Sequence, residues 1–209
     1  MWDELVRSLD DAGRAELQTV LRTRRYAKGV VVFSEGDFGD ALHVVAAGAL
    51  LVERLTDQGD TVAVAVLGPG AVVGEQALIG EDRRGATVRA LTEASTRSLA
   101  RPVFQELREL HRQFDWFLVR MLDLRNREMY DLLLEARHHP AERRVRRCLV
   151  EVAAHFGDEI PLKQETIAAL AGTTRPTANA VLRDIEACGV IELRRGRILV
   201  VDGLKLLDL

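Results

Sequence analysis

The stretch that decides the fold runs from Ile160 to Val201 and reads IPLKQETIAALAGTTRPTANAVLRDIEACGVIELRRGRILVV. A short amphipathic helix is predicted to end at Gly172, and a second helix is predicted to begin directly after it. Two apolar, strand-like runs follow and are joined through Arg195 and Gly196. This order of helix, tight turn, helix and hairpin is typical of a winged helix-turn-helix, which places one helix in a groove of DNA.

The two predicted helices carry their apolar residues on one face. Gly172 permits the left-handed backbone that ends the first helix, and Thr173 or Thr174 can cap the second. Pro176 suits the first turn of the second helix, because the amide hydrogen that proline lacks would have no partner there. The positions predicted to face the core are Ile167, Leu170, Ala171, Val181, Leu182 and Ile185.

Polar residues at the start of the second helix, along it and at the hairpin tip suit contacts with DNA. Arginine pairs in bidentate fashion with guanine and asparagine with adenine, so Arg175 and Asn179 are expected to read base edges. The other polar positions of the helix are expected to include phosphate contacts, and the hairpin tip is expected to touch the backbone or the minor groove. The predicted DNA-binding residues are Thr173, Thr174, Arg175, Thr177, Asn179, Arg183, Arg195 and Arg197.

The net charge of the chain is −3, but the basic residues of the C-terminal third occur in local clusters. From Pro140 onward the chain has 11 Lys and Arg residues against 10 Asp and Glu, whereas the preceding part has 18 against 22. A surface that faces DNA needs local positive charge rather than a basic total. The segment Arg143–Arg147 is either part of such a surface or a solvated arginine-rich helix, and its sequence leaves both interpretations open.

Short β-branched runs separated by glycine turns dominate residues 24–99, after a helix predicted over residues 2–21. Many short strands at near-regular spacing favour an antiparallel roll or barrel. His43 lies on one of these runs and is predicted to be a packed or edge histidine. The predicted strands cover residues 30–33, 41–45, 49–52, 61–67 and 86–90, with turns at 35–37, 47–48, 57–60 and 68–70.

A long helical stretch follows the strands. Pro102 opens it, and it is predicted to run, with a break near His111, to about Arg137. One set of its residues steps by 4, 3, 4, 3 and 4, which is the spacing of a coiled-coil seam. A second apolar set (Phe114, Phe117, Met121 and Leu124) widens the stripe, and a helix that covers its own domain shows the same breadth. The predicted seam consists of Leu118, Leu122, Arg125, Met129, Leu132 and Ala136.

The sequence His138-His139-Pro140 breaks this helix and marks the predicted domain boundary. Residues 1–138 are predicted to form a sensor domain that includes a dimerisation helix over about residues 112–137. Residues 139–209 are predicted to form the DNA-binding domain, beginning with a helix over residues 141–156. A single helix-turn-helix covers little DNA, whereas a dimer reads two half-sites about one helical turn apart. The sequence therefore predicts a homodimer.

Several classes of protein are not supported by the sequence. No apolar run approaches the roughly 18 residues of a transmembrane helix, and the N-terminus lacks the pattern of a signal peptide. Cys148 and Cys188 lie too far apart for a local metal motif and are predicted to be core thiols. No P-loop, partnered nucleophile or metal-spacing cluster suggests an enzyme. We expect a cytoplasmic protein with neither catalytic activity nor a membrane partner.

Three stretches together resemble a known family. The first is EGD at 35–37 with LHVVAAG at 42–48, the second is LGPGAVVGEQAL at 67–78 with RGATVRA at 84–90, and the third is TRPT at 174–177 with VLR at 181–183. They resemble the catabolite activator protein/FNR (CRP/FNR) family of bacterial transcription regulators, over the whole chain. The resemblance implies an α+β fold with an N-terminal antiparallel β-roll of the cyclic-nucleotide-binding type, a long dimerisation helix and a C-terminal winged helix-turn-helix. It also implies RNA polymerase as a partner.

The second stretch resembles the family's phosphate-binding cassette. The resemblance implies that Glu75 accepts a hydrogen bond from the ribose 2′-hydroxyl and that Arg84 neutralises the cyclic phosphate. Gly85 stands where the family has a hydroxyl residue that bonds the phosphate, and Tyr130 stands near the positions that read the adenine. The residues implied in ligand binding are Gly74, Glu75, Gln76, Ala77, Arg84, Gly85 and Tyr130.

The sequence does not identify the effector. The cassette favours cAMP or another cyclic nucleotide, but the missing hydroxyl at Gly85 also fits a vestigial pocket in a ligand-independent, architectural DNA-binding protein. A different effector is the third alternative. An iron–sulfur sensor is rejected because no cysteine precedes Cys148, and neither haem nor a metal ion is expected.

Overall fold

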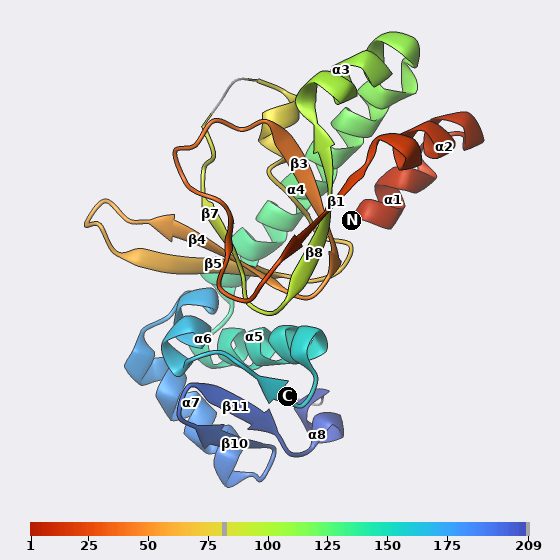
Figure 1. Cartoon of the computed structure of the whole chain (residues 1–209). Coiled ribbons are helices and arrows are strands. Elements are labelled where there is room, and N and C mark those ends of the chain that lie inside the picture. The colour runs from red at the N-terminus through yellow and green to blue at the C-terminus, as the bar shows by residue number, and fades with distance from the viewer. Residues whose placement is uncertain (81–82, 208–209) are drawn as a thin grey trace. The chain divides into compact units, whose positions relative to one another are not determined.

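The computed structural model describes residues 1–80 and 83–207, and the chain divides into two compact units (Figure 1). The first unit comprises residues 1–55 and 67–130. The second comprises residues 56–66 and 131–209. Residues 208 and 209, which end the predicted DNA-binding domain, lie outside the described part of the chain. Within the described residues, no helix is long and apolar enough to cross a membrane.

The N-terminal region forms two helices where one was predicted over residues 2–21. They are α1 (Trp2–Arg7) and α2 (Asp11–Val20). Asp10 separates them because its backbone is extended and its side chain accepts a hydrogen bond of 2.8 Å from the amide of Gly13. An aspartate in this position caps the helix that follows. The apolar residues of positions 2–21 therefore lie on two helices rather than on one.

The strands between residues 22 and 100 form two four-stranded sheets. Their orders are β1-β8-β3-β6 and β2-β7-β4-β5, and β8 pairs antiparallel with both β1 and β3. The antiparallel roll predicted from the sequence is therefore confirmed. The strands are β1 (Arg22–Tyr26), β2 (Val31–Phe33), β3 (Ala41–Ala47), β4 (Leu50–Leu55), β5 (Thr61–Leu67), β6 (Val72–Val73), β7 (Thr87–Ala90) and β8 (Ala94–Ala100).

Three strands of the first sheet, β1, β6 and β8, were not predicted, and β1 and β8 were missed because their sequences are polar. Strand β1 reads RTRRY, and four of its five residues are exposed at the edge of the sheet. Strand β8 reads ASTRSLA and buries Thr96 and Ser98 along with its apolar residues. Neither strand shows the apolar alternation by which a half-buried strand is recognised in a sequence.

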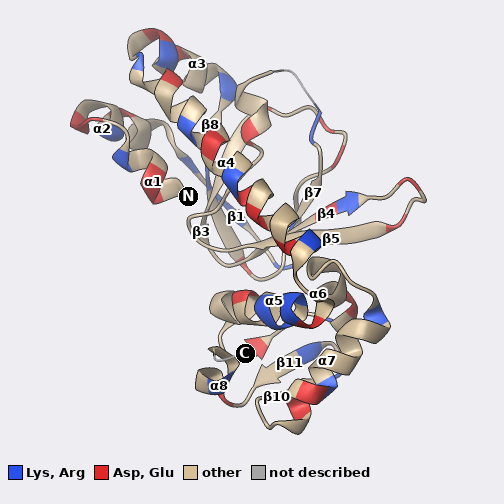
Figure 2. Cartoon of the chain, turned by 180° about the vertical axis from the view of Figure 1, so that it is seen from behind, with Lys and Arg blue, Asp and Glu red and all other residues tan. Residues whose placement is uncertain are grey.

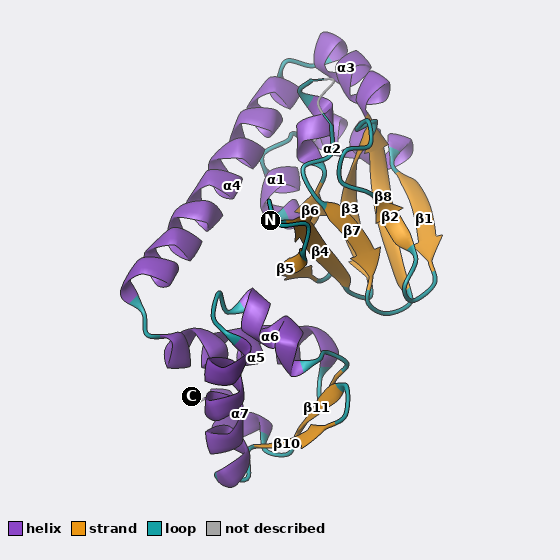
Figure 3. Ribbon diagram, turned by 90° about the vertical axis from the view of Figure 1, so that its left-hand side faces the viewer, coloured by secondary structure: helices purple, strands orange, loops and turns teal. Residues whose placement is uncertain are grey.

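Two further helices follow the roll, α3 (Arg101–Leu110) and α4 (Gln113–His138). The predicted break near His111 is confirmed, and α4 is one continuous helix of 26 residues (Figure 3). Phe114, Phe117 and Met121 of α4 are fully buried in the core that β3 and β8 share with the N-terminal helices. The second apolar set of the sequence therefore covers the helix's own domain.

The positions of α4 predicted to form a coiled-coil seam do not all behave alike. Leu122, Met129 and Leu132 are exposed. Leu118 is partly buried against the core of the first unit, and Arg125 forms an ion pair with a buried carboxylate. Two of the six predicted seam positions, Leu118 and Arg125, thus contribute to the fold of the first unit, and the seam itself stays a prediction.

His43 occupies the opposite face of β3 from Leu42 and Val44 and is only 5% exposed. Its Nδ1 lies 3.2 Å from Oγ1 of Thr96 on β8, which confirms the prediction of a packed histidine. Burial, with a smaller contribution from nearby arginines, lowers the pKa of His43 to about 4. The imidazole is therefore neutral in the folded protein at neutral pH.

The second unit has the order predicted from residues 160–201. Helix α5 covers the predicted 141–156, and β10, β11 and β9 form a three-stranded sheet in that order. Cys148 is buried as predicted, but the prediction for Cys188 was wrong, because it caps the exposed C-terminal end of α7. The elements are α5 (Ala141–Phe156), β9 (Glu159–Ile160), α6 (Gln164–Leu170), α7 (Arg175–Ala187), β10 (Ile191–Arg194), β11 (Arg197–Val200) and α8 (Gly203–Leu207).

The buried imidazole predicts an acid-sensitive fold. The unfolded chain protonates His43 near pH 6.5 and the folded chain only near pH 4. Stability from this group is therefore full above pH 6.5 and falls between pH 6.5 and 4, by on the order of 3 kcal/mol. In denaturant titrations at several pH values, His43→Gln should flatten this part of the profile. The exposed His155, changed to Gln, is the matched control, and an unchanged slope in His43→Gln would refute the assignment.

Candidate functional site

Gly74 shapes the cassette of the first unit. It connects β6 to a short 3₁₀ helix, η1 (Glu75–Leu78), and has a φ of 76°. Glycine adopts this left-handed conformation without strain. A β-carbon at this position would also collide with Nη1 of Arg84 and lie 3.3 Å from the carbonyl oxygen of Ala41. Residue 74 therefore needs glycine both for its conformation and for the space that Arg84 occupies.

Glu75 is a buried carboxylate, 9% exposed, and its partner comes from α4. Nε of Arg125 donates to Oε1 of Glu75 at 2.9 Å, and Nη2 donates to the carbonyl of Val72 at 2.7 Å. Nη1 of the same arginine donates to Glu128 at 2.9 Å. The guanidinium group of Arg125 thus links the cassette to α4. The sequence predicted Arg125 in a coiled-coil seam and did not predict this contact.

Arg84 is buried as well, with 6% of its surface exposed. Its Nη1 donates to the carbonyl of Gly74 at 3.1 Å and its Nη2 to the carbonyl of Ala41 at 2.7 Å. The guanidinium carbon lies 4.1 Å from the ring centroid of Phe33, and burial lowers the pKa of Arg84. Its Nε is buried and has no hydrogen-bond partner among the described residues.

The other residues implied in ligand binding differ in their exposure to solvent and in their contacts. The amide of Ala77 donates to the carbonyl of Gly74 at 3.1 Å, and Gln76 is exposed. A β-carbon on Gly85 would meet only Oε1 of Gln76, at 3.8 Å, so a larger side chain fits there. Tyr130 is 63% exposed and forms no hydrogen bond with the described residues. The chain brings Gly74, Glu75 and Arg84 together but leaves Tyr130 apart from them.

Arg144 of α5 holds the turn between α6 and α7. Its Nε donates to the carbonyl of Ala171 and its Nη2 to the carbonyl of Gly172, each at 2.9 Å. Its Nη1 donates to the carbonyl of His139, also at 2.9 Å. Gly172 has a φ of 59°, as the predicted helix end requires. Arg144 therefore donates hydrogen bonds to carbonyls that have no partner at the end of a helix. The sequence showed Arg144 only as part of a run of arginines and did not predict this role.

The first turn of α7 is capped as the sequence predicted. Oγ1 of Thr174 accepts a hydrogen bond of 3.4 Å from the amide of Thr177, and the two hydroxyl oxygens lie 2.9 Å apart. Thr173 donates its amide to the carbonyl of Ala168 at 3.0 Å. The hydroxyl groups of Thr174 and Thr177 are thus occupied by the cap, which positions Arg175 as the first residue of the helix.

The outer face of α7 presents arginines, whereas Asn179 is partly turned inward. Arg175 and Arg183 are exposed, and neither forms an ion pair with the described residues. Oδ1 of Asn179 is buried and lacks a hydrogen-bond partner within the described chain. A bidentate contact with adenine needs that oxygen, so it requires a rotation of the amide group. Ala180, which the sequence did not single out, is exposed on the same helix.

The arginines of the hairpin differ in whether they have an ionic partner. Arg194 pairs with Glu192 at 2.9 Å, and Arg197 pairs with Glu159 at 2.7 Å. Arg195 lies in the turn, is exposed and has no ionic partner in the described part of the chain. Of the two hairpin residues predicted to contact DNA, Arg195 is the one whose charge is not already neutralised.

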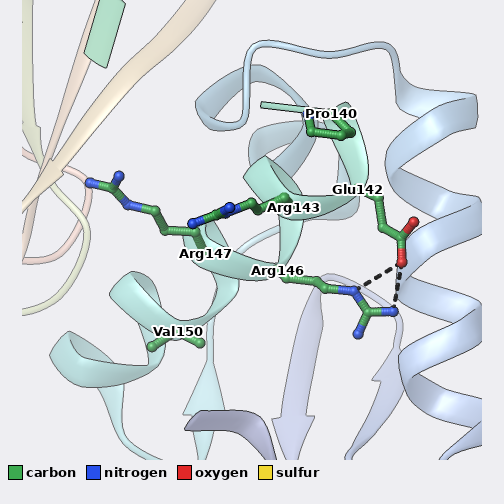
Figure 4. A pocket seen from close by; sticks show the side chains of 6 residues that line it. All are labelled: Pro140, Glu142, Arg143, Arg146, Arg147 and Val150. Atoms are coloured by element: carbon green, nitrogen blue, oxygen red, sulfur yellow. Dashed lines mark hydrogen bonds and ion pairs between the residues drawn. The ribbon is translucent and has the colours of Figure 1, made fainter. Parts of the chain in front are cut away.

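The arginine run of α5 lines an open groove with Pro140, Glu142 and Val150 (Figure 4). Arg146 donates to Glu142 at 2.9 Å, and Arg147 pairs with Glu135 and Glu151, each at 2.7 Å. Arg143 points away from the Glu142–Arg146 pair. Basic residues thus gather on α5 and recur along α7 (Figure 2), but most of those on α5 have partners within the fold.

No group of three or more His, Cys, Asp or Glu residues suited to a metal ion occurs in residues 1–80 and 83–207.

Comparison with known proteins covers both units. Residues 23–111 match the family model of the cyclic nucleotide-binding domain, and residues 143–209 match that of the Crp-like helix-turn-helix domain. The cyclic AMP receptor protein of Thermus thermophilus is 32% identical, over 84% of this chain and 82% of its own. A CRP-like cAMP-activated global transcriptional regulator of Mycobacterium tuberculosis is 26% identical, over 97% of this chain and 94% of its own.

Solved structures show the same architecture. The catabolite activator protein of Thermus thermophilus is 29% identical and aligns over 98% of this chain and 96% of its own, with a TM-score of 0.56. The c-di-GMP-responsive global regulator CLP of Xanthomonas campestris aligns over 91% of this chain and 99% of its own, with a TM-score of 0.72. Its identity is 20%, so that likeness concerns the fold alone.

Replacing Arg144 tests its role in the turn. Arg144→Ala leaves the carbonyls of Ala171 and Gly172 without their charged donor, which should cost the helix-turn-helix about 2–3 kcal/mol. Both tryptophans, Trp2 and Trp116, lie in the first unit, so hydrogen exchange of α6 and α7 is the suitable measurement. Arg143→Ala, one position earlier, should leave this exchange unchanged. Equal protection in both variants would show that Arg144 does not hold the turn.

Proposed function

The chain belongs to the CRP/FNR family of transcription regulators, and from this premise we propose that it binds specific DNA sequences as a homodimer and responds to a cyclic nucleotide. The family assignment accounts for a cyclic-nucleotide-binding domain followed by a helix-turn-helix domain. The relatives compared above are named as transcription regulators or as receptors of cyclic AMP. The DNA sequence, the dimer and the effector are the parts that we propose.

The observation that carries the DNA-binding part is the set of arginines without ionic partners. From residue 140 onward the chain has nine arginines, and five of them are engaged in ion pairs or in bonds to backbone carbonyls. The remaining ones are exposed and form no ion pair with described residues, so their charges are available for phosphates and base edges. These are Arg143, Arg175, Arg183 and Arg195.

The dimer is supported by an apolar face on the second half of α4. Five apolar or aromatic residues within six positions are each more than half exposed, and such a patch marks an interaction surface. A second copy of the chain is the partner that also meets the requirement for two DNA-reading heads on one duplex. The residues are Met129, Tyr130, Leu132, Leu133 and Leu134.

The effector is proposed to bind at the cassette. Oε1 of Glu75 accepts from Arg125, and the carboxylate retains lone pairs for a ribose hydroxyl. The free Nε of Arg84 and the amides of η1 are the groups proposed to meet the cyclic phosphate. A contact of Tyr130 with the base would require a partner copy or a movement of α4. Binding of RNA polymerase and a cytoplasmic location stay predictions.

The vestigial-pocket alternative also has support. Both Nη groups of Arg84 already donate to carbonyls of the protein, and Gly85 offers no hydroxyl to a phosphate. In that case the first unit would serve as a scaffold for a ligand-independent DNA-binding protein. Calorimetry of the full chain with cAMP and cGMP separates the two proposals.

Adding the missing hydroxyl should strengthen the cassette. Gly85→Ser fits the available space and supplies a donor to the phosphate, so the affinity for cAMP should rise roughly tenfold or more. Gly203→Ser, at a position of the other unit where a β-carbon meets no atom within 4 Å, is the matched control for calorimetry. Absence of cAMP binding in both the wild type and Gly85→Ser would favour the vestigial pocket.

The two classes of DNA contact differ in their dependence on sequence. On duplexes selected from a random pool, Arg175→Ala should relax base preference at one position of each half-site, by about 1–3 kcal/mol. Arg195→Ala should weaken binding to all duplexes alike and lower the salt dependence of affinity by about one charge. Fluorescence anisotropy at several salt concentrations measures both effects. Equal, sequence-independent losses would contradict the division between Arg175 and Arg195.

A further inference from the structure

The outer face of α7 carries an apolar side chain at its centre. The buried residues of this helix are Ala178, Val181, Leu182 and Ile185. Because successive residues of an α-helix are about 100° apart, Ala180 lies almost opposite to the direction in which these residues point. The side chain of Ala180 is exposed, as is that of Pro176 one turn earlier. Neither side chain has a group that donates or accepts a hydrogen bond.

Cationic side chains precede and follow Ala180 along the helix. Arg175 and Arg183 are exposed, and neither forms an ion pair with the described residues. Such arginines attract the phosphates of DNA for any base sequence, so they bring α7 to the duplex. In a helix-turn-helix, the N-terminal part of the second helix contacts base edges in the major groove. Helix α7 is that second helix, and Ala180 lies in its second turn.

An alanine at such a place distinguishes bases without a hydrogen bond. Thymine is the base with an apolar group, its 5-methyl, at the edge that faces the major groove. Contact between that methyl group and the side chain of Ala180 removes apolar surface of both from water. The other bases place polar groups against the alanine, and these groups lose hydrogen bonds to water that the alanine cannot replace.

The neighbouring Asn179 does not supply the hydrogen bonds that would read the adenine of the same pair. A bidentate contact with adenine uses both the oxygen and the nitrogen of an asparagine amide. Oδ1 of Asn179 is buried and has no partner within the described chain, so it is not presented to a base in this conformation. The methyl group of Ala180, the next residue, is exposed instead. An adenine–thymine pair under this turn is therefore read from its thymine.

We propose that Ala180 is a specificity-determining residue, which selects a thymine at one base pair of each DNA half-site through contact between two methyl groups. The inference rests on the proposed binding of specific DNA sequences and names one base that α7 prefers. Pro176 extends the apolar surface toward the start of the helix. The half-site therefore combines a guanine read by Arg175 with a thymine read by Ala180.

The contact is tested by removing the methyl group of the base. In a duplex selected from a random pool with the full-length protein, each thymine of one half-site is replaced in turn by deoxyuridine, which keeps the same hydrogen-bonding groups. One replacement should weaken binding about threefold to fivefold in anisotropy titrations, because one methyl group loses its apolar contact. A preferred duplex whose affinity no replacement lowers would overturn this inference alone. A protein that prefers no duplex would overturn the proposed function with it.

Variants of α7 assign the contact to Ala180. Ala180→Gly lacks the methyl group, so the same deoxyuridine should change its affinity by less than about 1.5-fold, whereas Ala187→Gly, at the exposed last residue of the helix, should keep the full effect. An equal effect in both variants would overturn the assignment.

A change of base preference gives a second test, which does not depend on the stability of the glycine variant. Arginine pairs with guanine in bidentate fashion, so duplexes selected with Ala180→Arg should carry a guanine pair in place of the sensitive thymine pair. Ala187→Arg adds the same charge at the end of the helix and should select the wild-type sequence. Retention of the thymine pair by Ala180→Arg would show that residue 180 does not read this base.

Discussion

The ion pair between Glu75 and Arg125 is the contact on which the proposed regulation depends. Glu75 is buried, and a buried carboxylate is strongly destabilising unless a cation and hydrogen bonds compensate its charge. Arg125 provides both, and it also holds the carbonyl of Val72 in the strand that leads into the cassette. Any ligand that donates a hydrogen bond to Glu75 therefore acts on α4 through a single side chain. The exposed apolar half of that same helix is the surface proposed to join two copies.

Arginine serves two separate purposes in this chain. Arg84, Arg125 and Arg144 each donate to two or more backbone carbonyls or carboxylates and so hold together segments that are distant in the chain. Arg175, Arg183 and Arg195 are exposed and unpaired within the described chain. A net charge of −3 is compatible with DNA binding. Paired and unpaired arginines contribute equally to the net charge, but only unpaired arginines give the surface a local positive charge. The local environment of each arginine, rather than its number, thus identifies the face proposed to meet DNA.

Local signals in the sequence predicted much of this structure. Gly172, the Thr174 cap and the apolar spacing of α6 and α7 follow from short-range rules, and the structure confirms them. The polar strands β1 and β8, the inward turn of Asn179 and the partners of Arg125 and Arg144 were not predicted. Those features depend on residues distant in the chain, such as Glu75 for Arg125 and Ala171 for Arg144. A periodicity reports which face of a helix is apolar, but not which charged group a neighbouring element presents to it.

The most direct test measures whether the Glu75–Arg125 contact couples ligand to DNA. Anisotropy titrations would compare the affinity of the full chain for a selected duplex with and without saturating cAMP, and then with cGMP, in the wild type and in Arg125→Gln. The account predicts a ligand-dependent change in wild-type DNA affinity of about fivefold or more, and most of that change should be lost in Arg125→Gln. A wild-type affinity that neither nucleotide alters, or an equal change in Arg125→Gln, would contradict it.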